Sequence, residues 1–595
     1  MLARTHNFHV FVFFASLLIY GALALWMTQQ WKPLGDEPHY LMAAHSLAFD
    51  RDLELANNYA QRDYQKFLDG ETLDPHVKIL PNGAQLLNHD LGLPFFLALP
   101  YAFGGRAGAE IFLACIGALL AWQMWKLAFD VTHSAVWATA SWLGLAFTPP
   151  LVMYATLIYP EALGALIFIF ATRTFLFQDP AHVLRQRVVL MASATAILPF
   201  LSVRFVALAT LLVIGALAQW HARRSRALFF VAVVVFGIAA YFFINGVLLA
   251  GTVPRGNPTE LATGNLASFS LAALVRGVIG WWIDPQRGTL ILAPVYVLAL
   301  AGIPRLLRQN FRVGIFLIAP LLVLIPLVAL LGGFWIPFEV GARYFVVALP
   351  LLAAPFALAL RAGFENVSRV RAFAFAALTI FLTGLSFWHS ALMVTDAAYA
   401  YGSVVSAYSR VVGTDVSSLF AGMGRSGIIS PRDAPNENTP RVSIEQRAGE
   451  TVWHTAQGDA GTILSSFDLT ELTVGNYALE FRAAANGGND DASVLLLDIF
   501  SAEGLPLLHS EWNGRELQSD TLKTITLPFD NPYFDRWGFP LTLQVTTTGE
   551  AEIFLSALYF NPNTPTMWLR AAIWVALILL LVVVLNLDWL ERIPK

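Results

Sequence analysis

Residues 31–40 read Trp-Lys-Pro-Leu-Gly-Asp-Glu-Pro-His-Tyr, and they follow the first apolar stretch of the chain. Two adjacent carboxylates, Asp36 and Glu37, stand there beside a proline, a histidine and a tyrosine. Charge is costly where lipid touches a protein, and ionisable residues near a membrane tend to be functional. Because Pro38 restricts the local backbone, this stretch predicts a site at the membrane surface with Asp36 and Glu37 at its acidic centre.

The composition predicts a polytopic membrane protein. Of the 595 residues, 56% are hydrophobic and only 13% are charged, whereas a soluble chain carries roughly a quarter charged residues. The length leaves room for a second domain. Cys115 is the only cysteine, so no intramolecular disulfide is possible. No small-residue cleavage site follows the apolar stretch at 8–27, which we interpret as a retained helix rather than a removed signal peptide.

About twelve apolar segments are long enough to cross a bilayer, which takes ~20 residues. They are residues 8–27, 107–129, 134–151, 160–178, 187–201, 203–221, 226–249, 287–304, 312–331, 342–361, 371–391 and 566–589. Basic residues concentrate in alternate loops, at Lys126, Arg185, Arg187, Arg223, Arg224, Arg226, Arg305, Arg308, Arg312, Arg361, Arg369, Arg371, Arg592 and Lys595. Since basic loops face the cytoplasm, both termini are predicted to be cytoplasmic, in a bacterial-type inner membrane.

The segment Leu91–Gly105 is apolar but short, and it contains two prolines before a Gly-Gly pair. Counting it as a span would invert every later loop and place the arginines outside. We therefore predict a re-entrant or interfacial segment, which membranes allow where protein covers the backbone. Residues 28–106 then form a large first external loop, in which residues 40–49 suit a helix at the membrane surface.

The domain boundaries follow from these assignments. Residues 1–391 are predicted to form the membrane domain, 392–440 a linker, 441–563 an extracytoplasmic β-sandwich of jelly-roll type, and 564–595 a final spanning helix. The sandwich is predicted from short alternating apolar runs. These runs are Thr462–Leu469, Tyr477–Ala483, Ser493–Ile499, Leu522–Leu527, Leu541–Thr546 and Glu552–Tyr559.

Ionisable residues gather at the predicted external helix ends. They are Asp36, Glu37, His89, Asp90, Glu161, Arg204, Asp284, Arg287, Glu339 and Arg343. Several have a purely structural alternative: Arg204 could extend to the interface, Glu161 could favour a helix N-terminus, and Asp284 could pair with Arg287. Chemically, a carboxylate can act as a general base on a hydroxyl, while arginines can hold a phosphate through paired charge-assisted bonds. No zinc spacing is present.

Several motifs resemble the type C membrane glycosyltransferases (the GT-C superfamily), in particular the bacterial branch like dolichyl-phosphate-mannose transferases and its aminoarabinose and arabinofuranose relatives. The motifs are Gly35–Tyr40, His89–Pro94, Tyr159–Glu161, Gly288–Tyr296, Gly332-Gly333 and Ala342–Phe345. The resemblance covers about residues 8–391.

The resemblance implies an inverting transferase that takes a sugar from a polyprenyl-phosphate donor at the extracytoplasmic surface. It implies Asp36 as the general base, with Glu37 beside it. The remaining motif and surface residues are expected to bind substrate: His39, His89, Asp90, Glu161, Arg204, Asp284, Arg287, Arg343 and Tyr344. Some relatives use a divalent cation such as Mg²⁺ or Mn²⁺, but no second Asp-x-Asp motif is present here, so no metal ligand is assigned.

The acceptor is expected to be a cell-envelope glycan, a lipid or a protein. Membrane lipids are the other expected partners, and no nucleic acid is expected. Two alternatives from other classes stay open, which are a transporter or flippase of lipid-linked glycans and a non-catalytic glycan-binding scaffold. A flippase needs charged residues through the bilayer interior, whereas here they lie at one surface. A scaffold predicts that Asp36 is dispensable.

Overall fold

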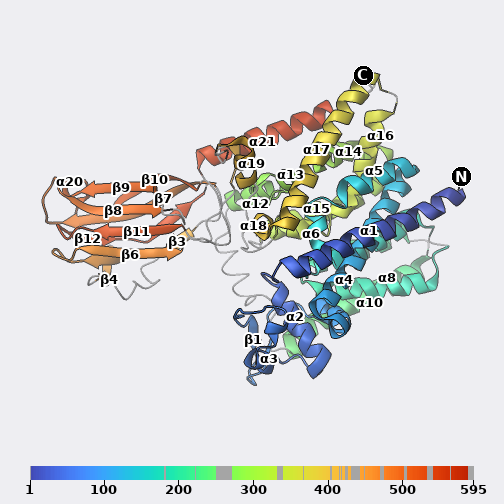
Figure 1. Ribbon diagram of the computed structural model, residues 1–595, viewed down its shortest axis with the longest axis horizontal. Helices are drawn as coiled ribbons and strands as arrows, with labels where there is room; N and C mark the ends of the chain where they lie inside the picture. The colour runs from blue at the N-terminus through green and yellow to red at the C-terminus, as the bar shows by residue number, and fades with distance from the viewer. Residues whose placement is uncertain are drawn as a thin grey trace. The chain divides into compact units, whose positions relative to one another are not determined.

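The computed structural model divides into a helical unit, residues 1–282, 288–400 and 577–595, and a β-rich unit, residues 283–287 and 401–576. The prediction of a helical polytopic protein with a C-terminal β-rich domain is confirmed (Figure 1). The residues described are 2–179, 182–220, 223–248, 271–330, 340–365, 367–401, 405–414, 416, 419–422, 427–429, 442–447, 449–468, 475–500, 506–531, 541–562 and 564–586.

Apolar helices make up most of the helical unit. Six of the described helices are long and apolar enough to cross a membrane. They are α1, α4, α10, α15, α17 and α21. The helices are α1 (Leu2–Gln30), α4 (Gly92–Thr132), α5 (Ala135–Leu145), α6 (Leu151–Tyr154), α7 (Glu161–Phe177), α8 (Arg185–Leu201), α9 (Phe205–Gln219), α10 (Arg224–Phe243), α12 (Leu271–Ile283), α13 (Thr289–Leu292), α14 (Tyr296–Gln309), α15 (Phe311–Leu330), α16 (Ala353–Phe364), α17 (Arg369–Thr395) and α21 (Pro565–Val584).

Five of the other six predicted spans form shorter helices than the sequence indicates, and the sixth, 187–201, lies within the slightly longer α8. α7 and α8 have 17 residues each, or about 25 Å at 1.5 Å per residue. The predicted span 342–361 is broken into two 3₁₀ turns, Arg343–Phe345 and Leu349–Leu352, before α16 begins. Proline explains part of this break, because Pro350 lies within the second turn and cannot donate a helical hydrogen bond.

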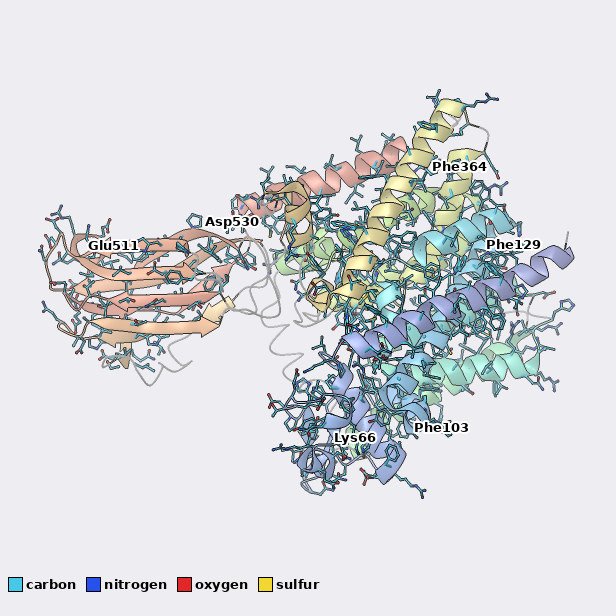
Figure 2. All side chains as sticks on the ribbon, viewed as in Figure 1. Lys66, Phe103, Phe129, Phe364, Glu511 and Asp530 are labelled. Carbon is cyan, nitrogen blue, oxygen red and sulfur yellow. The ribbon has the colours of Figure 1, made fainter. Side chains whose placement is uncertain are left out.

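α4 contains the predicted re-entrant segment and bends sharply within it. Gly105 has φ 56° and ψ −143°, which no helix tolerates. A Cβ on Gly108 would lie 2.2 Å from the carbonyl oxygen of Pro100, although residues eight apart in one straight helix are about 12 Å apart. The arm before Gly105 therefore turns back onto the arm after it. That first arm is about 20 Å long, shorter than the ~30 Å hydrocarbon core, and its Phe103 is 85% exposed (Figure 2).

The end of α1 is anchored to α4, which fixes where the first loop begins. Arg106 donates from Nε to Glu110 Oε1 at 2.6 Å and from Nη1 to the Trp31 carbonyl at 2.6 Å. Thr28 of α1 donates to the same Glu110 carboxylate. Because Glu110 is 3% exposed, losing Arg106 would leave a buried carboxylate without its cation.

The first loop folds into short elements rather than an open connection. They are α2 (Glu37–His45), a π turn (Ser46–Asp50), α3 (Ala56–Gln61), a 3₁₀ turn (Asp63–Lys66) and the hairpin β1 (Val77–Ile79) and β2 (Gln85–Leu87). A helix forms where the sequence predicts one at 40–49, but every residue of α2 is buried. The prediction that residues 40–49 form a helix on the membrane surface is wrong for residues 40–45, because protein covers α2 on all sides.

The β-rich unit is a sandwich of two antiparallel sheets. The first has the order β3-β13-β7-β12-β5-β4, with β10 also paired to β7, and the second has the order β6-β11-β8-β9 (Figure 1). The strands are β3 (Gly427–Ile429), β4 (Val442–Arg447), β5 (Glu450–Thr455), β6 (Gly461–Asp468), β7 (Gly475–Asn486), β8 (Ser493–Phe500), β9 (Pro506–Asn513), β10 (Lys523–Asn531), β11 (Thr542–Thr547), β12 (Glu552–Leu555) and β13 (Leu558–Asn561). One core draws on both sheets, with Trp453 and Leu479 from the first and Leu497 and Val545 from the second.

Candidate active site

Asp36 stands at the start of α2 in a position where aspartate usually caps the helix. Gly35, with φ 58°, makes the turn before it, a conformation that glycine adopts without steric cost. The Asp36 side chain makes no capping hydrogen bond. Its Oδ2 instead accepts a 2.9 Å bond from Arg343 Nη1, and its Oδ1 lies 3.6 Å from His89 Nε2. The carboxylate is thus directed away from its own helix and toward distant parts of the chain.

Arg343 connects Asp36 to a second carboxylate. Its Nε donates to Glu161 Oε1 at 2.7 Å, and Arg204 Nη2 donates to the same oxygen at 3.2 Å. The side chains of Arg343 and Glu161 are 2% and 0% exposed, against 14% for Arg204 and 16% for Asp36. Four charges of alternating sign therefore form one buried chain, which is the arrangement that makes charges tolerable out of water.

Two tyrosines support the arginines. The Arg343 guanidinium lies 4.2 Å from the ring centre of Tyr159, and that of Arg204 lies 3.8 Å from the ring centre of Tyr344. Such contacts stabilise a cation electrostatically. Trp281 of α12 packs edge-on against Tyr344, with ring centres 5.6 Å apart. Trp281 is buried, so here it packs against the site rather than facing lipid headgroups.

Glu37 has a different environment from Asp36. Its Oε1 accepts from the Ile158 amide at 2.8 Å and its Oε2 from the Leu34 amide at 3.1 Å. Burial raises the pKa of Glu37 to about 7, against the two backbone bonds, which lower it. Tyr159 also donates from its hydroxyl to the Leu34 carbonyl. These bonds attach the start of α2 to the segment before α7, which carries Glu161.

A group of histidines lies next to Asp36. His39 Nδ1 lies 3.1 Å from the Tyr59 hydroxyl, and its ring stacks on His76 with centres 4.1 Å apart. Burial, followed by the neighbouring His76 and His89, lowers the pKa of His39 to about 3. His39 is therefore neutral at ordinary pH and acts as a hydrogen-bonding group.

Asp90 joins the first loop to other helices. Its Oδ2 accepts from the Val203 amide at 3.1 Å and its Oδ1 from the Tyr241 hydroxyl at 2.8 Å. This places Asp90 next to the segment that carries Arg204.

The structure brings together Asp36, His89, Glu161, Arg204, Arg343 and Tyr344 from the predicted set, with Glu37 and His39 beside them. Asp284 and Arg287 lie in the segment 283–287, which groups with the β-rich unit. There Asp284 Oδ1 accepts from the amides of Gln286 and Arg287 at 2.9 and 3.0 Å. Glu339 and the Gly332-Gly333 motif lie outside the described residues.

Two features of the site have no clear signal in the sequence. His76 is an ordinary aromatic residue until the fold stacks it on His39. Tyr159 does belong to a quoted motif, but only the fold shows that its ring lies against Arg343. Ala342 adopts φ 59° directly before Arg343, a left-handed conformation that is uncommon outside glycine and often marks functional sites.

Two polar atoms at the centre have no hydrogen-bond partner among the described residues. They are Glu161 Oε2 and Arg204 Nη1, and both are buried. Buried polar atoms are nearly always bonded, so each exception calls for an explanation such as a ligand or water. No group of three or more candidate metal ligands occurs within the part of the chain that the structure describes.

Fold and site together define an integral membrane protein with a buried, charge-paired polar centre. No protein-family model and no curated protein matches the chain. Solved structures with similar folds include ArnT from Cupriavidus metallidurans in the apo state (16% identity, TM-score 0.40, 64% of this chain and 63% of that one) and arabinosyltransferase EmbB from Mycobacterium smegmatis (11% identity, TM-score 0.35, 92% of this chain and 64% of that one). The chain thus spans less than two thirds of either structure. At TM-scores below 0.5, neither structure assigns a fold family or an activity to this chain.

Proposed function

We propose that this chain is an inverting membrane glycosyltransferase that moves a sugar from a polyprenyl-phosphate donor to an acceptor hydroxyl outside the cytoplasmic membrane. The observation that carries the proposal is the bonded series Asp36–Arg343–Glu161–Arg204, which combines a partly exposed carboxylate with two arginines. Glycosyl transfer from a lipid phosphate needs both groups, because one must accept a proton while the other stabilises a leaving phosphate.

Asp36 is the proposed base, and Glu37 is the proposed positioning residue. Both oxygens of Glu37 are bonded to backbone amides and its side chain is 2% exposed. Asp36 is more exposed and its carboxylate is held by side chains, which can rearrange. This favours Asp36 as the group that contacts the reacting hydroxyl.

Donor binding is proposed to release the base. Arg204 Nη1 is buried and has no hydrogen-bond partner among the described residues, so it can donate to a phosphate without losing a bond to any of them. A phosphate that also bonds Arg343 competes with Asp36 for Nη1, and one Asp36 oxygen becomes able to accept a proton. The acceptor oxygen then bonds to the anomeric carbon, its proton moves to Asp36, and the bond between that carbon and the phosphate breaks. The lipid phosphate leaves with the electron pair, paired to the arginines.

Attack from the face opposite the leaving phosphate inverts the anomeric centre. No metal enters these steps, since the two arginines supply the positive charge. Whether a divalent cation such as Mg²⁺ or Mn²⁺ affects the activity is tested by the assay with chelator below. The described residues offer no cluster of metal ligands.

The experiment is reconstitution of the full chain in liposomes with a panel of polyprenyl-phosphate sugars and matching nucleotide sugars. The expected result is turnover with one lipid-linked donor, product of inverted anomeric configuration by NMR, and activity retained in chelator. Turnover with a nucleotide sugar alone would contradict the proposed donor class. Movement of lipid-linked sugar between leaflets without any new glycosidic bond would instead support a flippase.

A further inference from the structure

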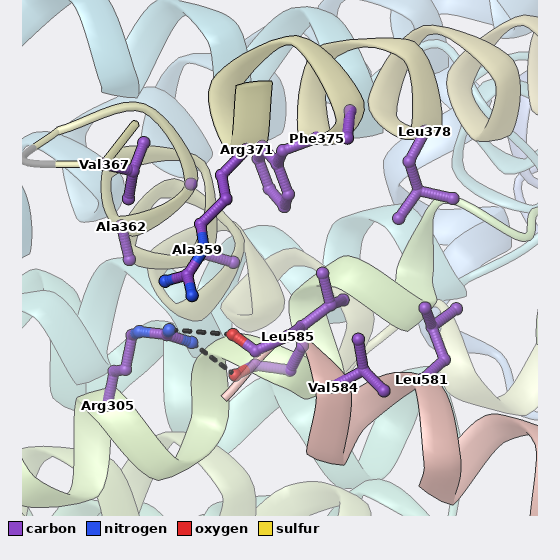
Figure 3. Close-up of a pocket in the computed structure, with 13 residues that line it drawn as sticks. Arg305, Ala359, Ala362, Val367, Arg371, Phe375, Leu378, Leu581, Val584 and Leu585 are labelled. Carbon is purple, nitrogen blue, oxygen red and sulfur yellow. Dashed lines mark hydrogen bonds between the residues drawn. The ribbon is translucent and has the colours of Figure 1, made fainter. Parts of the chain in front are cut away.

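Basic residues gather at the helix ends that the charge distribution predicts to be cytoplasmic, and they differ in what they contact. Arg305 of α14 lines a pocket of about 330 Å³ between α14, α16, α17 and the end of α21 (Figure 3). It donates to the Asn586 side chain at 2.6 Å and to the Leu585 carbonyl at 2.9 Å. These bonds attach the end of α21 to α14, so this arginine has a structural role within the chain.

A second basic group, the Lys126 cluster, lies where α4, α7 and α8 pack together. It comprises Lys126 and Asp130 of α4, Arg173 of α7 and Arg187 of α8. Arg173 donates from Nε and Nη2 to Asp130 Oδ2 at 2.8 and 2.6 Å, which neutralises one cation. The three cations lie close enough for their charges to act on one another. Since they share one described carboxylate, the cluster has an excess of positive charge.

Lys126 is partly buried, and its closest partner is an aromatic ring. Its Nζ lies 3.8 Å from the ring centre of Trp122, one turn earlier on α4. The indole Nε1 of Trp122 is buried and has no hydrogen-bond partner among the described residues. Buried donors are nearly always bonded, so an exception of this kind calls for a ligand or a water. An ammonium and an indole N–H therefore lie side by side, and both can donate to an anion.

The cluster lies at the height of lipid headgroups. Lys126 is about 9 Å before the end of α4, Arg173 about 6 Å before the end of α7 and Arg187 about 3 Å after the start of α8. Headgroups occupy the layer just outside the ~30 Å hydrocarbon core, where spanning helices end. Basic pockets between spanning helices on the cytoplasmic side bind anionic headgroups. Position and charge thus indicate the same kind of ligand.

Apolar side chains that suit acyl chains lie deeper on the neighbouring helices. α1 reaches the cluster, since the ring centre of His9 lies 6.0 Å from that of Trp122. Further along α1, Phe11 and Phe14 are exposed, and Leu190 is exposed on α8. Exposed apolar surface on spanning helices is the surface that lipid covers. A headgroup at the cluster would therefore have hydrocarbon-facing side chains beneath it.

We propose that the Lys126 cluster binds the phosphate of an anionic phospholipid, with Lys126 and Arg187 as the cations and the Trp122 indole as a further donor. The site is separate from the candidate active site, because Glu161 begins α7 and Arg173 lies about 18 Å further along that helix. It does not depend on the proposed glycosyl transfer. A bound lipid would stabilise the packing of α1 and α8 beside α4.

Native mass spectrometry of the full chain, titrated with phosphatidylglycerol, phosphatidylcholine or inorganic phosphate, tests the proposal. We expect wild type to bind phosphatidylglycerol most tightly, because phosphatidylcholine carries its own cation and inorganic phosphate has no acyl chains. Lys126→Gln is expected to lose about fivefold of the phosphatidylglycerol affinity, the effect of one cation near an anionic lipid, and Lys126→Arg to keep it. Arg369→Gln is the matched control, because Arg369 is exposed at the start of α17, outside the cluster.

Trp122→Phe isolates the indole donor, because it keeps a ring under Lys126 and removes the N–H. We expect it to weaken phosphatidylglycerol binding by about fivefold, the effect of one hydrogen bond. Binding that this variant leaves unchanged would contradict the proposal.

Equal affinity of wild type for the two lipids would overturn the proposal. So would equal losses in Lys126→Gln and Arg369→Gln, because the basic surface as a whole would then attract the lipid. Inorganic phosphate that binds as tightly as phosphatidylglycerol, and that Lys126→Gln no longer binds, would assign the site to a free anion instead of a lipid.

Discussion

The Asp36 carboxylate is held by Arg343 rather than by its own helix, and this one bond organises the candidate site. Arg343 is 2% exposed and bonds Asp36 and Glu161 at once. The sequence indicates that all three residues carry chemistry, since each is ionisable and lies near a predicted helix end. It does not indicate that one guanidinium joins the two carboxylates, because these residues are separated by 307 and 182 positions along the chain.

Arg343→Gln tests how much this arginine stabilises the fold. The variant leaves two carboxylates buried without their shared cation, a change that costs about 3–5 kcal/mol. We expect a large loss of thermal stability in detergent, which is measured as a decrease in the midpoint temperature of unfolding. Arg361→Gln is the control, because it breaks an exposed ion pair with Glu365 and should cost less than about 1 kcal/mol. Similar losses in both variants would show that the buried series of charges stabilises the fold no more than an exposed ion pair does.

The raised pKa of Glu37 predicts that the free energy of unfolding depends on pH. Its pKa is raised by burial from 4.5 to about 7 in the folded chain, so the folded state binds the proton more tightly than the unfolded state. Its stabilising contribution is complete below pH 4.5 and is lost as pH rises through about 7, by on the order of 3 kcal/mol.

The Glu37→Gln variant has no carboxyl group to titrate at this position. The difference in unfolding midpoint, variant minus wild type, is therefore expected to move in favour of the variant between pH 4.5 and 7.5. Circular dichroism melts across that range measure it. A difference that stays constant with pH would mean that Glu37 does not titrate in this window.

At the scale of elements, the bend in α4 is the feature that composition explains best. A short apolar segment with two prolines before Gly104-Gly105 predicts a helix that does not cross the membrane. The structure adds the backbone conformation at Gly105 and the close approach of Gly108 to Pro100. The buried state of α2 was not predictable, because its apolar face gives the same pattern against lipid as against protein.

Gly105→Ala and Gly104→Ala form a matched pair on this bend. A Cβ at either position would meet nothing within 4 Å, but only Gly105 has a positive φ, +56°. Alanine at Gly105 is therefore expected to cost about 1–3 kcal/mol through backbone strain, while alanine at Gly104 should be neutral or slightly stabilising. Thermal melts of the two variants measure the difference. Equal stability would contradict the bend as described.

At the scale of the whole molecule, the fold class followed from simple patterns, whereas the lengths of individual elements did not. Apolar windows and alternating runs predicted membrane helices followed by a β-sandwich, and both are present. The run Glu552–Tyr559 was predicted as one strand but forms two, β12 and β13, which both pair with β7. Alternation alone does not reveal this break, because both strands bury side chains in the same core.

The predicted orientation in the membrane gives a test at this scale. Cys115 is first replaced by alanine, and single cysteines are then placed at Glu71 and His182, which the predicted topology puts on opposite sides of the membrane. Both positions can react with a label, because those side chains are 48% and 84% exposed. A membrane-impermeant maleimide on intact cells is expected to label Glu71→Cys. His182→Cys should react only after the membrane is opened. The reverse pattern would invert the topology and place the candidate site in the cytoplasm.

The most direct test of the central claim compares Asp36→Asn with wild type in reconstituted transfer, with donor binding measured separately. The account predicts a 10²–10⁴-fold loss of kcat with donor affinity unchanged or tighter, because the arginines remain and the carboxylate that competes with the phosphate for Arg343 is gone. Asp74→Asn, an exposed carboxylate in the same loop, should keep full activity. Asp36→Asn with wild-type kcat would contradict the assignment of Asp36 as the base.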